Sequence, residues 1–390
     1  MDFSTHPMFE WLQDLRRDFH RQPETAFQEF ATTRKIMDTF RGLGLGIRKL
    51  DGQETGAVGL LEGVPGKRVL GLRADIDALP IQEENDVAYR SQNDGSMHAC
   101  GHDAHTTIML GVAKKLVDSG AAKKLRGRVK FVFQPAEESV KGAKAMIDAG
   151  VLQDPAMDRI LACHMWNEGD VGQVGLYKGP SHAATDRFDL VIHGKGAHGA
   201  RPHKSIDPIV AGAHFVTALQ TIASRNINPV DAAVVTVGKF IGGTAANIIP
   251  ERAELRGTLR SFTDEVRDLA MRRIEEIVAG LRTTFRVETE YEFIQGVPAC
   301  TNNETVSQAL KAAAIDVVGE KNVHFIERDT GGEDFGLFTR VIPGALMRLG
   351  CMNPAKGIIH PTHSPHFDID ESVLPIGVEI ITRAVTDYLV

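Results

Sequence analysis

The order of strand-like and helix-like segments changes near Phe188 and changes back after Gln295. Before residue 180, segments with apolar residues at helical spacing alternate with short apolar runs that predict strands. Between the two changes the order is strand, helix, strand, strand, helix, strand, which is the ferredoxin-like arrangement. After Gln295 the first type of pattern returns. The chain therefore predicts an α/β fold in which one unit interrupts another.

The interrupted unit is expected to be an open sheet with helices on both faces. A chain of 390 residues exceeds what one hydrophobic core usually serves, which also favours two domains. We expect the main domain over 1–184 and 296–390, and the inserted βαββαβ domain over 185–295. Within the inserted domain, Thr263 is expected as the N-cap of a long helix.

Composition excludes several classes of partner and location. The net charge is -7 and the pI is near 6.1, so we expect no nucleic-acid partner, because phosphate binding needs a concentrated basic surface. No apolar run approaches 18 residues, so we expect no membrane span and no export signal. The four cysteines are far apart and form no CxxC pair, which predicts a reduced, cytoplasmic protein.

The stretch MHACGHDAHTT places Cys100 two residues before His102. The thiol could be redox-active, a nucleophile, a buried core cysteine or a metal ligand. In an extended or loop segment residues i and i+2 point the same way, so the pair could hold one ion. A helix expected to begin near Asp103 would favour the thiolate through its dipole. The pair alone leaves these alternatives open.

Three other fragments carry ligand-type side chains after strand-like runs. In FVFQPAEES, Glu137 and Glu138 follow a buried strand, and adjacent side chains of an extended segment would point apart. In ILACHMWN, His164 is expected at the carboxyl end of a strand. A late loop holds three histidines, namely His360, His363 and His366. Each fragment has a common structural explanation, because paired glutamates are usually exposed and single histidines often lie in the core.

The four fragments together favour a metal site. Open α/β sheets gather ligands outside the carboxyl ends of their strands. Thiolate, imidazole and carboxylate suit Zn, Mn, Co or Ni better than Mg or Ca. Five candidate ligands, with one late histidine among them, exceed the four of a closed zinc site, so two neighbouring ions are expected.

Nine motifs occur in order between Arg73 and Glu371: RADIDALP, MHACGHDAHT, QPAEE, CHMWN, GKGAHGARPH, AANIIPE, GTLRSF, GGEDFG and HSPHFDIDE. In this respect the chain resembles the M20 metallopeptidase superfamily, in its branch of amidohydrolases that includes hippurate hydrolase, N-acyl-amino-acid deacylase and auxin-conjugate hydrolase. The resemblance implies that the metals are bound by Cys100, His102, Glu138, His164 and His363. It also implies that Glu137 is the general base and that Asp75 supports the site from behind. In the wider superfamily a metal histidine stands where this chain has Arg73.

The resemblance further implies that the inserted domain is a lid that mediates a homodimer or a dimer-based oligomer. His198 matches a lid histidine that reaches an active site, where it would meet the oxyanion, and Asn247 matches a substrate-contacting asparagine. The substrate carboxylate is expected to meet Asn247 and either Arg201 or Arg260.

The function implied is metal-dependent hydrolysis of the amide bond of an N-acyl-L-amino acid, such as a hippurate-like conjugate. A metal would lower the pKa of a water towards roughly 7, and Glu137 would accept its proton. The alternatives are a dipeptidase or carboxypeptidase of the same superfamily that acts on short peptides, and a binding homologue without activity. The acyl group, the amino acid and the native metal stay open at this point.

Overall fold

The structure of the chain is a computed structural model that describes residues 3–390. The chain forms two compact units: the first contains the residues up to Ser181, Thr301–Glu327 and Asp334–Val390, and the second contains His182–Cys300 and Arg328–Glu333. Each unit has its own cluster of buried apolar side chains. The predicted fold class, an α/β sheet domain with a ferredoxin-like insertion, is confirmed. The catalytic and lid roles of the two domains, and the bounds at 184 and 296, stay predictions.

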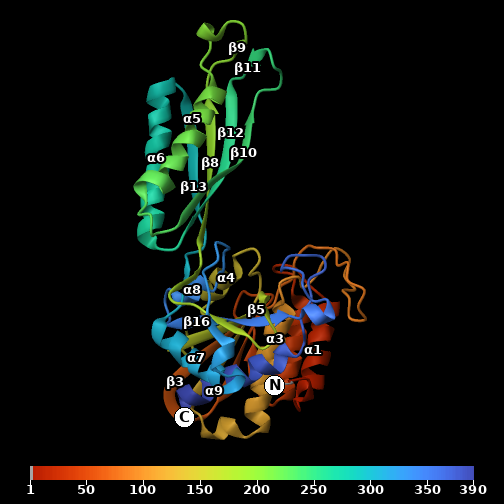
Figure 1. Cartoon of the computed structure of the whole chain (residues 1–390). Helices are drawn as coiled ribbons and strands as arrows, with labels where there is room; N and C mark the ends of the chain where they lie inside the picture. Colours follow the sequence, from red (N-terminus) through yellow and green to blue (C-terminus); the bar gives the residue numbers. More distant parts are fainter. Residues whose placement is uncertain (1–2) are drawn as a thin grey trace. The chain divides into compact units, whose positions relative to one another are not determined.

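The first unit is built on a mixed sheet (Figure 1). Its strands, in the order in which they lie side by side, are β1 (Gly46–Arg48), β2 (Ala57–Glu62), β4 (Arg126–Gln134), β3 (Val64–Asp75), β5 (Arg159–Asp170), β16 (Gly344–Met352), β6 (Val174–Leu176) and β15 (Val323–Phe325). The four central strands, β4, β3, β5 and β16, run parallel to one another. Their carboxyl ends therefore point to the same edge of the sheet.

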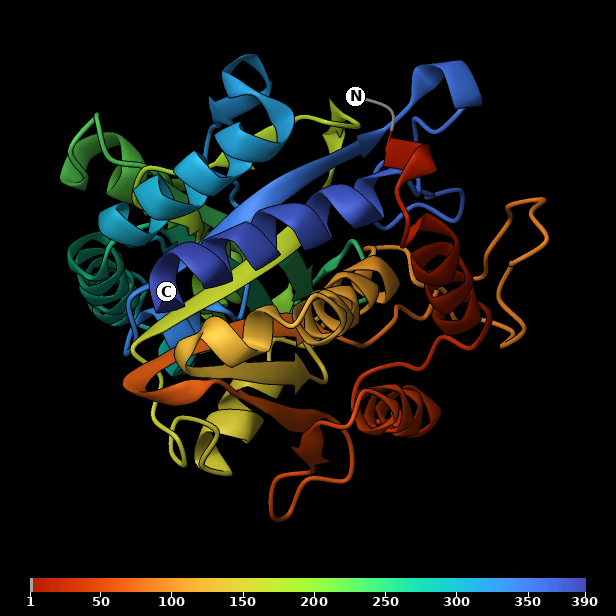
Figure 2. The same ribbon diagram turned by 90° about the horizontal axis from the view of Figure 1, so that it is seen from below.

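Helices cover both faces of this sheet. The longer ones are α1 (Phe9–Arg21), α2 (Phe30–Gly42), α3 (His102–Asp118), α7 (Glu304–Val318) and α9 (Val373–Leu389). Figure 2 shows α3 and α9 side by side, and α1 and α7 pack beside them. The short helices α4 (Gly142–Asp148) and α8 (Gly336–Thr339) contact each other and the opposite face. No helix within residues 3–390 is both long and apolar enough to cross a membrane.

Helix α3 brings functional groups into the middle of the unit because it is buried on almost every side. All residues from His102 to Ala113 are buried, so the helix has no solvent face over its first three turns. A helix that is apolar all round belongs in a core. The polar side chains of its first turn must therefore find partners inside the protein.

The second unit has the order expected from the sequence. Its main strands, again in their order in the sheet, are β10 (Ala233–Gly242), β12 (Arg252–Ser261), β8 (Ala184–His193) and β13 (Glu288–Gln295), all antiparallel. Helices α5 (Pro208–Thr221) and α6 (Asp264–Phe285) cover one face (Figure 1). The Thr263 side chain accepts a hydrogen bond from the N–H of Val266, which confirms it as the N-cap of α6. A small separate ribbon joins β9 (Ala197–His198) to β11 (Ile248–Ile249).

Short elements complete the chain. The strands β7 (Pro180–His182) and β14 (Cys300–Thr301) pair where the sequence of the insertion begins and ends. The remaining short helices are η1 (Phe3–Thr5), η2 (Ala121–Lys124), η3 (Pro202–Lys204), η4 (Ile222–Asn226), η5 (Glu320–Asn322) and η6 (Pro354–Lys356).

Candidate metal centre

The predicted donor residues of the first unit gather at the carboxyl edge of its central strands. Asp75 is the last residue of β3, and Glu137 is the third residue after the end of β4. His164 lies within β5, which continues to Asp170, so its predicted place at the end of a strand was wrong. The reason is that β3 pairs with β5 only as far as Ala162, while β16 pairs with β5 well beyond that point. His164 therefore lies just beyond the point where the pairing of β5 with β3 ends.

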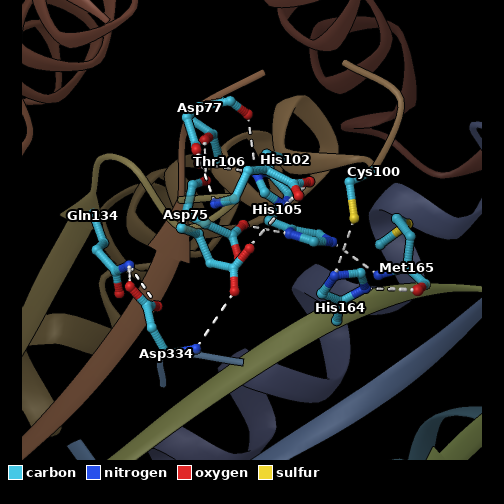
Figure 3. Close-up of polar contacts among 12 residues, drawn as sticks. Asp75, Asp77, Cys100, His102, His105, Thr106, Gln134, His164, Met165 and Asp334 are labelled. Carbon is cyan, nitrogen blue, oxygen red and sulfur yellow. Dashed lines mark hydrogen bonds and ion pairs between the residues drawn. The ribbon is translucent and has the colours of Figure 1, made fainter. Parts of the chain in front are cut away.

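The backbone between Cys100 and His102 is a turn, which falls within the extended or loop conformations that the sequence left open. Gly101 has φ 86°, a left-handed conformation that glycine adopts without steric cost, and α3 begins at His102. A Cβ at Gly101 would lie 2.6 Å from Cγ of Met165. This tight reversal still brings the pair to one place, because a ligand atom of His102 lies within 4.8 Å of Sγ of Cys100. The same sulfur lies 3.5 Å from Nε2 of His164 (Figure 3).

Glu137 and Glu138 lie in a turn rather than in the extended segment that was predicted. The N–H of Val140 closes this turn by donating to O of Glu137 at 2.6 Å. Helix α4 begins directly behind it, and a Cβ at Gly142 would lie 1.5 Å from the carbonyl oxygen of Pro135. Glycine at that position therefore allows the close approach. As a result both carboxylates face the same region as His102.

Of the three late histidines, His363 lies with the other donors. Its N–H donates to O of Ala99 at 2.7 Å, and its Nε2 lies 3.5 Å from Oε1 of Glu138. The rings of His360 and His366 lie 5.2 Å from each other instead.

Ligand atoms of these residues form overlapping groups. One atom each from Cys100, His102 and His164 lie within 4.8 Å of one another, and the same holds for Cys100, Glu138 and His363. A third such group contains His102, Glu137 and Glu138. Cys100 thus belongs to two groups, and the three groups taken together offer sulfur, nitrogen and oxygen donors. This donor chemistry suits zinc and similar transition metals.

Unsatisfied polar atoms in the site show that a cation fits it. Nε2 of His102 and Oε1 of Glu138 are buried and have no hydrogen-bond partner among residues 3–390. Nδ1 of His102 donates to the carbonyl oxygen of Asp77 at 2.9 Å, so the lone pair of the neutral ring is on Nε2. Buried polar atoms are costly when unpaired, and a divalent cation between them would satisfy both.

The surroundings adjust the protonation of the donors. Burial, assisted by the Arg348 guanidinium, holds the pKa of His164 well below its usual range, which keeps the imidazole in the neutral form that binds metals. Burial also raises the pKa of the Cys100 thiol to about 12, and the Glu138 carboxylate adds to this effect. A cation in contact with the sulfur would reverse that shift, because a coordinating thiol is deprotonated.

Asp75 connects the donor cluster to the strands behind it. Its carboxylate accepts from Nδ1 of His105 at 2.5 Å (Figure 3). It also accepts from Nη1 of Arg73 at 2.6 Å. Nε2 of His105 in turn accepts the N–H of Met165 at 2.8 Å, which fixes its tautomer and holds the backbone next to His164. Arg73 also donates to Asp334 at 3.0 Å. Arg73 is thus a structural cation among carboxylates in this chain.

A second buried network supports the start of α3 from the other side. Arg16 donates to Asp103 at 2.8 Å, and both side chains are fully buried. The same guanidinium donates to Asp368 at 3.0 Å and to Glu371 at 3.4 Å, in the segment that follows His363. No pattern in the sequence pointed to Arg16. By contrast, Asp77 and His105 stand two and three residues after recognised positions, and this spacing could have identified them.

In the second unit, three of the four predicted substrate contacts lie together. His198 pairs with Ile248 in the β9–β11 ribbon, the N–H of Gly199 donates to O of Asn247 at 2.7 Å, and the N–H of Arg201 donates to O of His198 at 2.7 Å. Arg260 is not part of this group. It pairs with Thr185 at the start of β8, at the opposite end of that strand from the ribbon.

The fold and this donor set together define a metal-binding hydrolase of the α/β class. The family model of peptidase family M20/M25/M40 matches residues 71–387, and the chain belongs to this family. The resemblance identified from the motifs is therefore confirmed.

Curated relatives and solved structures agree with this assignment. The chain is 37% identical over 366 residues to N-acetylcysteine deacetylase of Bacillus subtilis strain 168, covering 94% of this chain and 93% of the relative. It is 38% identical over 374 residues to thermostable carboxypeptidase 2 of Saccharolobus solfataricus, with coverage of 94% and 93%. The structure of the YXEP protein of Bacillus subtilis, a dinuclear metal-binding peptidase from the M20 family, superposes with a TM-score of 0.86 at 33% identity and covers 98% of both chains.

Proposed function

We propose that this chain is a metal-dependent amidohydrolase that cleaves the amide bond of N-acyl-L-amino acids, including hippurate-like conjugates. The observation that carries the proposal is the placement of Glu137 beside Glu138 in one turn, within reach of His102. This arrangement puts a carboxylate next to a set of metal donors, as hydrolysis of an unactivated amide requires. The relative with an N-acetylcysteine deacetylase activity supports an N-acyl substrate.

The residues that would hold the cations are Cys100, His102, Glu138, His164 and His363. Two ions per chain, drawn from Zn, Mn, Co and Ni, fit the two donor groups that share Cys100. When bound, divalent cations would polarise the scissile carbonyl and acidify the attacking water.

Glu137 performs the proton transfers in this proposal. Its Oε1 accepts the N–H of Asp334 at 3.4 Å, which restricts the orientation of the carboxylate. Asp334 is itself held by Arg73 and by Gln134, whose Nε2 lies 2.7 Å from Oδ1. A carboxylate held in this way can take a proton from the attacking water and deliver it to the leaving nitrogen. Asp75 supports the site without touching the substrate.

In the second unit, we propose that His198, Arg201 and Asn247 contact the substrate. Their common location in and beside the β9–β11 ribbon supports this. Arg260 remains a weaker candidate for the substrate carboxylate because it lies away from that ribbon. The homodimer and the cytoplasmic location stay predictions from the sequence.

A carboxypeptidase or dipeptidase is the second candidate function, and the 38% identity to thermostable carboxypeptidase 2 favours it. The two functions differ in whether the substrate carries a blocked or a free amine. The test is a hydrolysis screen of N-acetyl, N-benzoyl and indole-acetyl amino acids against unblocked dipeptides. The protein is first stripped with a chelator, and Zn, Mn, Co and Ni are added separately. Turnover of the blocked substrates that depends on added metal supports the proposal, while turnover of free dipeptides alone, or full activity without metal, contradicts it.

A further inference from the structure

The turn that carries Glu137 has a strained backbone. Ala136 has φ 55° and Val140 has φ 52°, so both ends of the turn are left-handed although neither residue is glycine. A β-branched residue such as Val140 rarely adopts this conformation. Strained backbone persists only where the surrounding structure holds it in place. The contacts of this turn therefore show what maintains the position of the base.

One contact comes from a buried carboxylate distant in the sequence. Oε1 of Glu29 accepts the N–H of Ala136 at 2.9 Å and the N–H of Phe27 at 3.0 Å. Phe27 is also left-handed, with φ 61°, so one oxygen holds two strained residues from separate segments. Glu29 is fully buried, and its hydrogen bonds therefore have no competition from bulk water.

A second carboxylate holds the other side of Glu137. Oδ2 of Asp77 accepts the N–H of Glu138 at 3.0 Å. The backbone N–H groups immediately before and after Glu137 are thus each bound by an acidic side chain. Asp77 also contacts His102, so a change at Asp77 would affect a predicted metal ligand as well as the turn. The two backbone N–H groups that Oε1 of Glu29 binds belong to the turn and to its own segment instead.

Glu29 is also the residue before α2, but it does not cap that helix through its side chain within the described part of the chain. Capping is done by Glu24, whose carboxylate accepts from the N–H of Ala31 at 3.0 Å and from the N–H of Thr32 at 2.8 Å. Glu24 therefore stabilises the start of α2, whereas Glu29 binds the turn that carries Glu137.

We propose that Glu29 is a positioning residue for the general base, and that it acts by binding the N–H of Ala136 and so fixing the turn from which Glu137 projects. This inference rests on the proposed role of Glu137. Because a hydrogen-bond acceptor of the right length is what the turn needs, the reach of the side chain matters more than its charge.

The test compares three variants of the full chain, each loaded with metal. Glu29→Asp keeps the charge but shortens the side chain, and Glu29→Gln keeps the length and an acceptor oxygen. Glu24→Asp is the matched control, because it shortens the neighbouring carboxylate that caps α2. Small misplacements of a catalytic group reduce turnover strongly, so kcat of Glu29→Asp should fall by about 10- to 100-fold with KM little changed. Glu29→Gln should stay within about threefold of the wild type, and Glu24→Asp should keep its kcat.

A measurement without turnover accompanies the kinetics. Hydrogen exchange of the metal-free protein, followed by mass spectrometry over residues 133–141, should speed up in Glu29→Asp and remain slow in Glu29→Gln and Glu24→Asp. Equal kcat and equal exchange in Glu29→Asp and the wild type would overturn the inference, as would an equal kcat loss in Glu24→Asp. If the wild type hydrolyses N-acyl amino acids and Glu137→Gln does not, a normal Glu29→Asp rejects only the inference. If the wild type is inactive on every such substrate, the proposed function fails, and the exchange data still test the contact.

Discussion

Nη1 of Arg348 lies 2.8 Å from Nδ1 of His164, the ring nitrogen that does not face Cys100. Burial and this guanidinium lower the pKa of His164. In Arg348→Met the pKa should rise, so protons compete with metal at acidic pH. We expect metal affinity, measured by competition with a chelating dye, to fall by about tenfold at pH 6 and by less at pH 8. Tyr177→Phe is the control, because it removes the hydroxyl that accepts from Nε of Arg348 but keeps the charge. Equal losses at both pH values would contradict this account.

Substitutions of the adjacent residues Glu137 and Glu138 should have different effects, one on the rate of hydrolysis and the other on metal binding. Glu137→Gln should lower kcat by about 100- to 10,000-fold, because a general base is lost, while the bound metal stays. Glu138→Gln should lower the metal content itself, since Oε1 of Glu138 is one of the unpaired donor atoms. Plasma mass spectrometry of the dialysed proteins measures the metal, and a hydrolysis assay measures the rate. Wild-type turnover by Glu137→Gln would remove Glu137 from the mechanism.

Neighbouring arginines of α1 should differ greatly in their effect on stability. Arg16 is fully buried against Asp103, and Arg16→Met removes the guanidinium that pairs with this carboxylate, which costs about 3–5 kcal/mol. Arg17 is 32% exposed and binds Glu371 from the outside, so Arg17→Met should cost less than about 1 kcal/mol. The midpoints of urea unfolding of the metal-free proteins measure the stability of the two variants. Similar midpoints for the two variants would show that the buried network adds no stability.

Stability should also depend on pH through Glu29. Burial raises the pKa of Glu29 from its ordinary value of 4.5 to about 7, against the opposing effect of its backbone hydrogen bonds. Between these two values the folded chain keeps a proton that the unfolded chain has lost. The free energy of unfolding therefore falls as pH rises through this window, by roughly 3 kcal/mol, and is constant above it.

In Glu29→Gln this loss is absent, because the amide does not ionise. The difference between the urea midpoints of Glu29→Gln and the wild type should therefore grow in favour of the variant from pH 5 to pH 7. Subtracting the two curves cancels the titration of the histidines, which both proteins share. Parallel curves over this range would contradict the raised pKa.

The sequence could predict the identity of the donor residues better than their geometry. Parallel strands bring their carboxyl ends to one edge, so ligand-type residues after separate strands were expected to meet. Cys100, Glu138 and His363 illustrate this, because they come from three segments and lie in one group. The inserted unit was equally predictable, since the βαββαβ order depends on local periodicity.

Local conformation was less predictable where distant contacts decide it. The turn at Glu137 was expected to be extended, because nothing near it in sequence requires a left-handed Ala136. The acceptor that holds this residue, Glu29, belongs to the start of α2. The prediction that His164 ends a strand was wrong for a similar reason. The length of β5 depends on its pairing with β16, which lies far along the chain. Long-range hydrogen bonds determine the conformation of this turn and the length of β5, so no short motif predicts them.

The position of the donors along the chain has a consequence for biosynthesis. Cys100, His102, Glu138 and His164 all precede the insertion, whereas His363 follows it. A ribosome thus finishes most of the donor set before it starts the second unit, and the last imidazole arrives only near the end of translation. The donor set is therefore complete only after an entire folding unit has been synthesised between its fourth and fifth members.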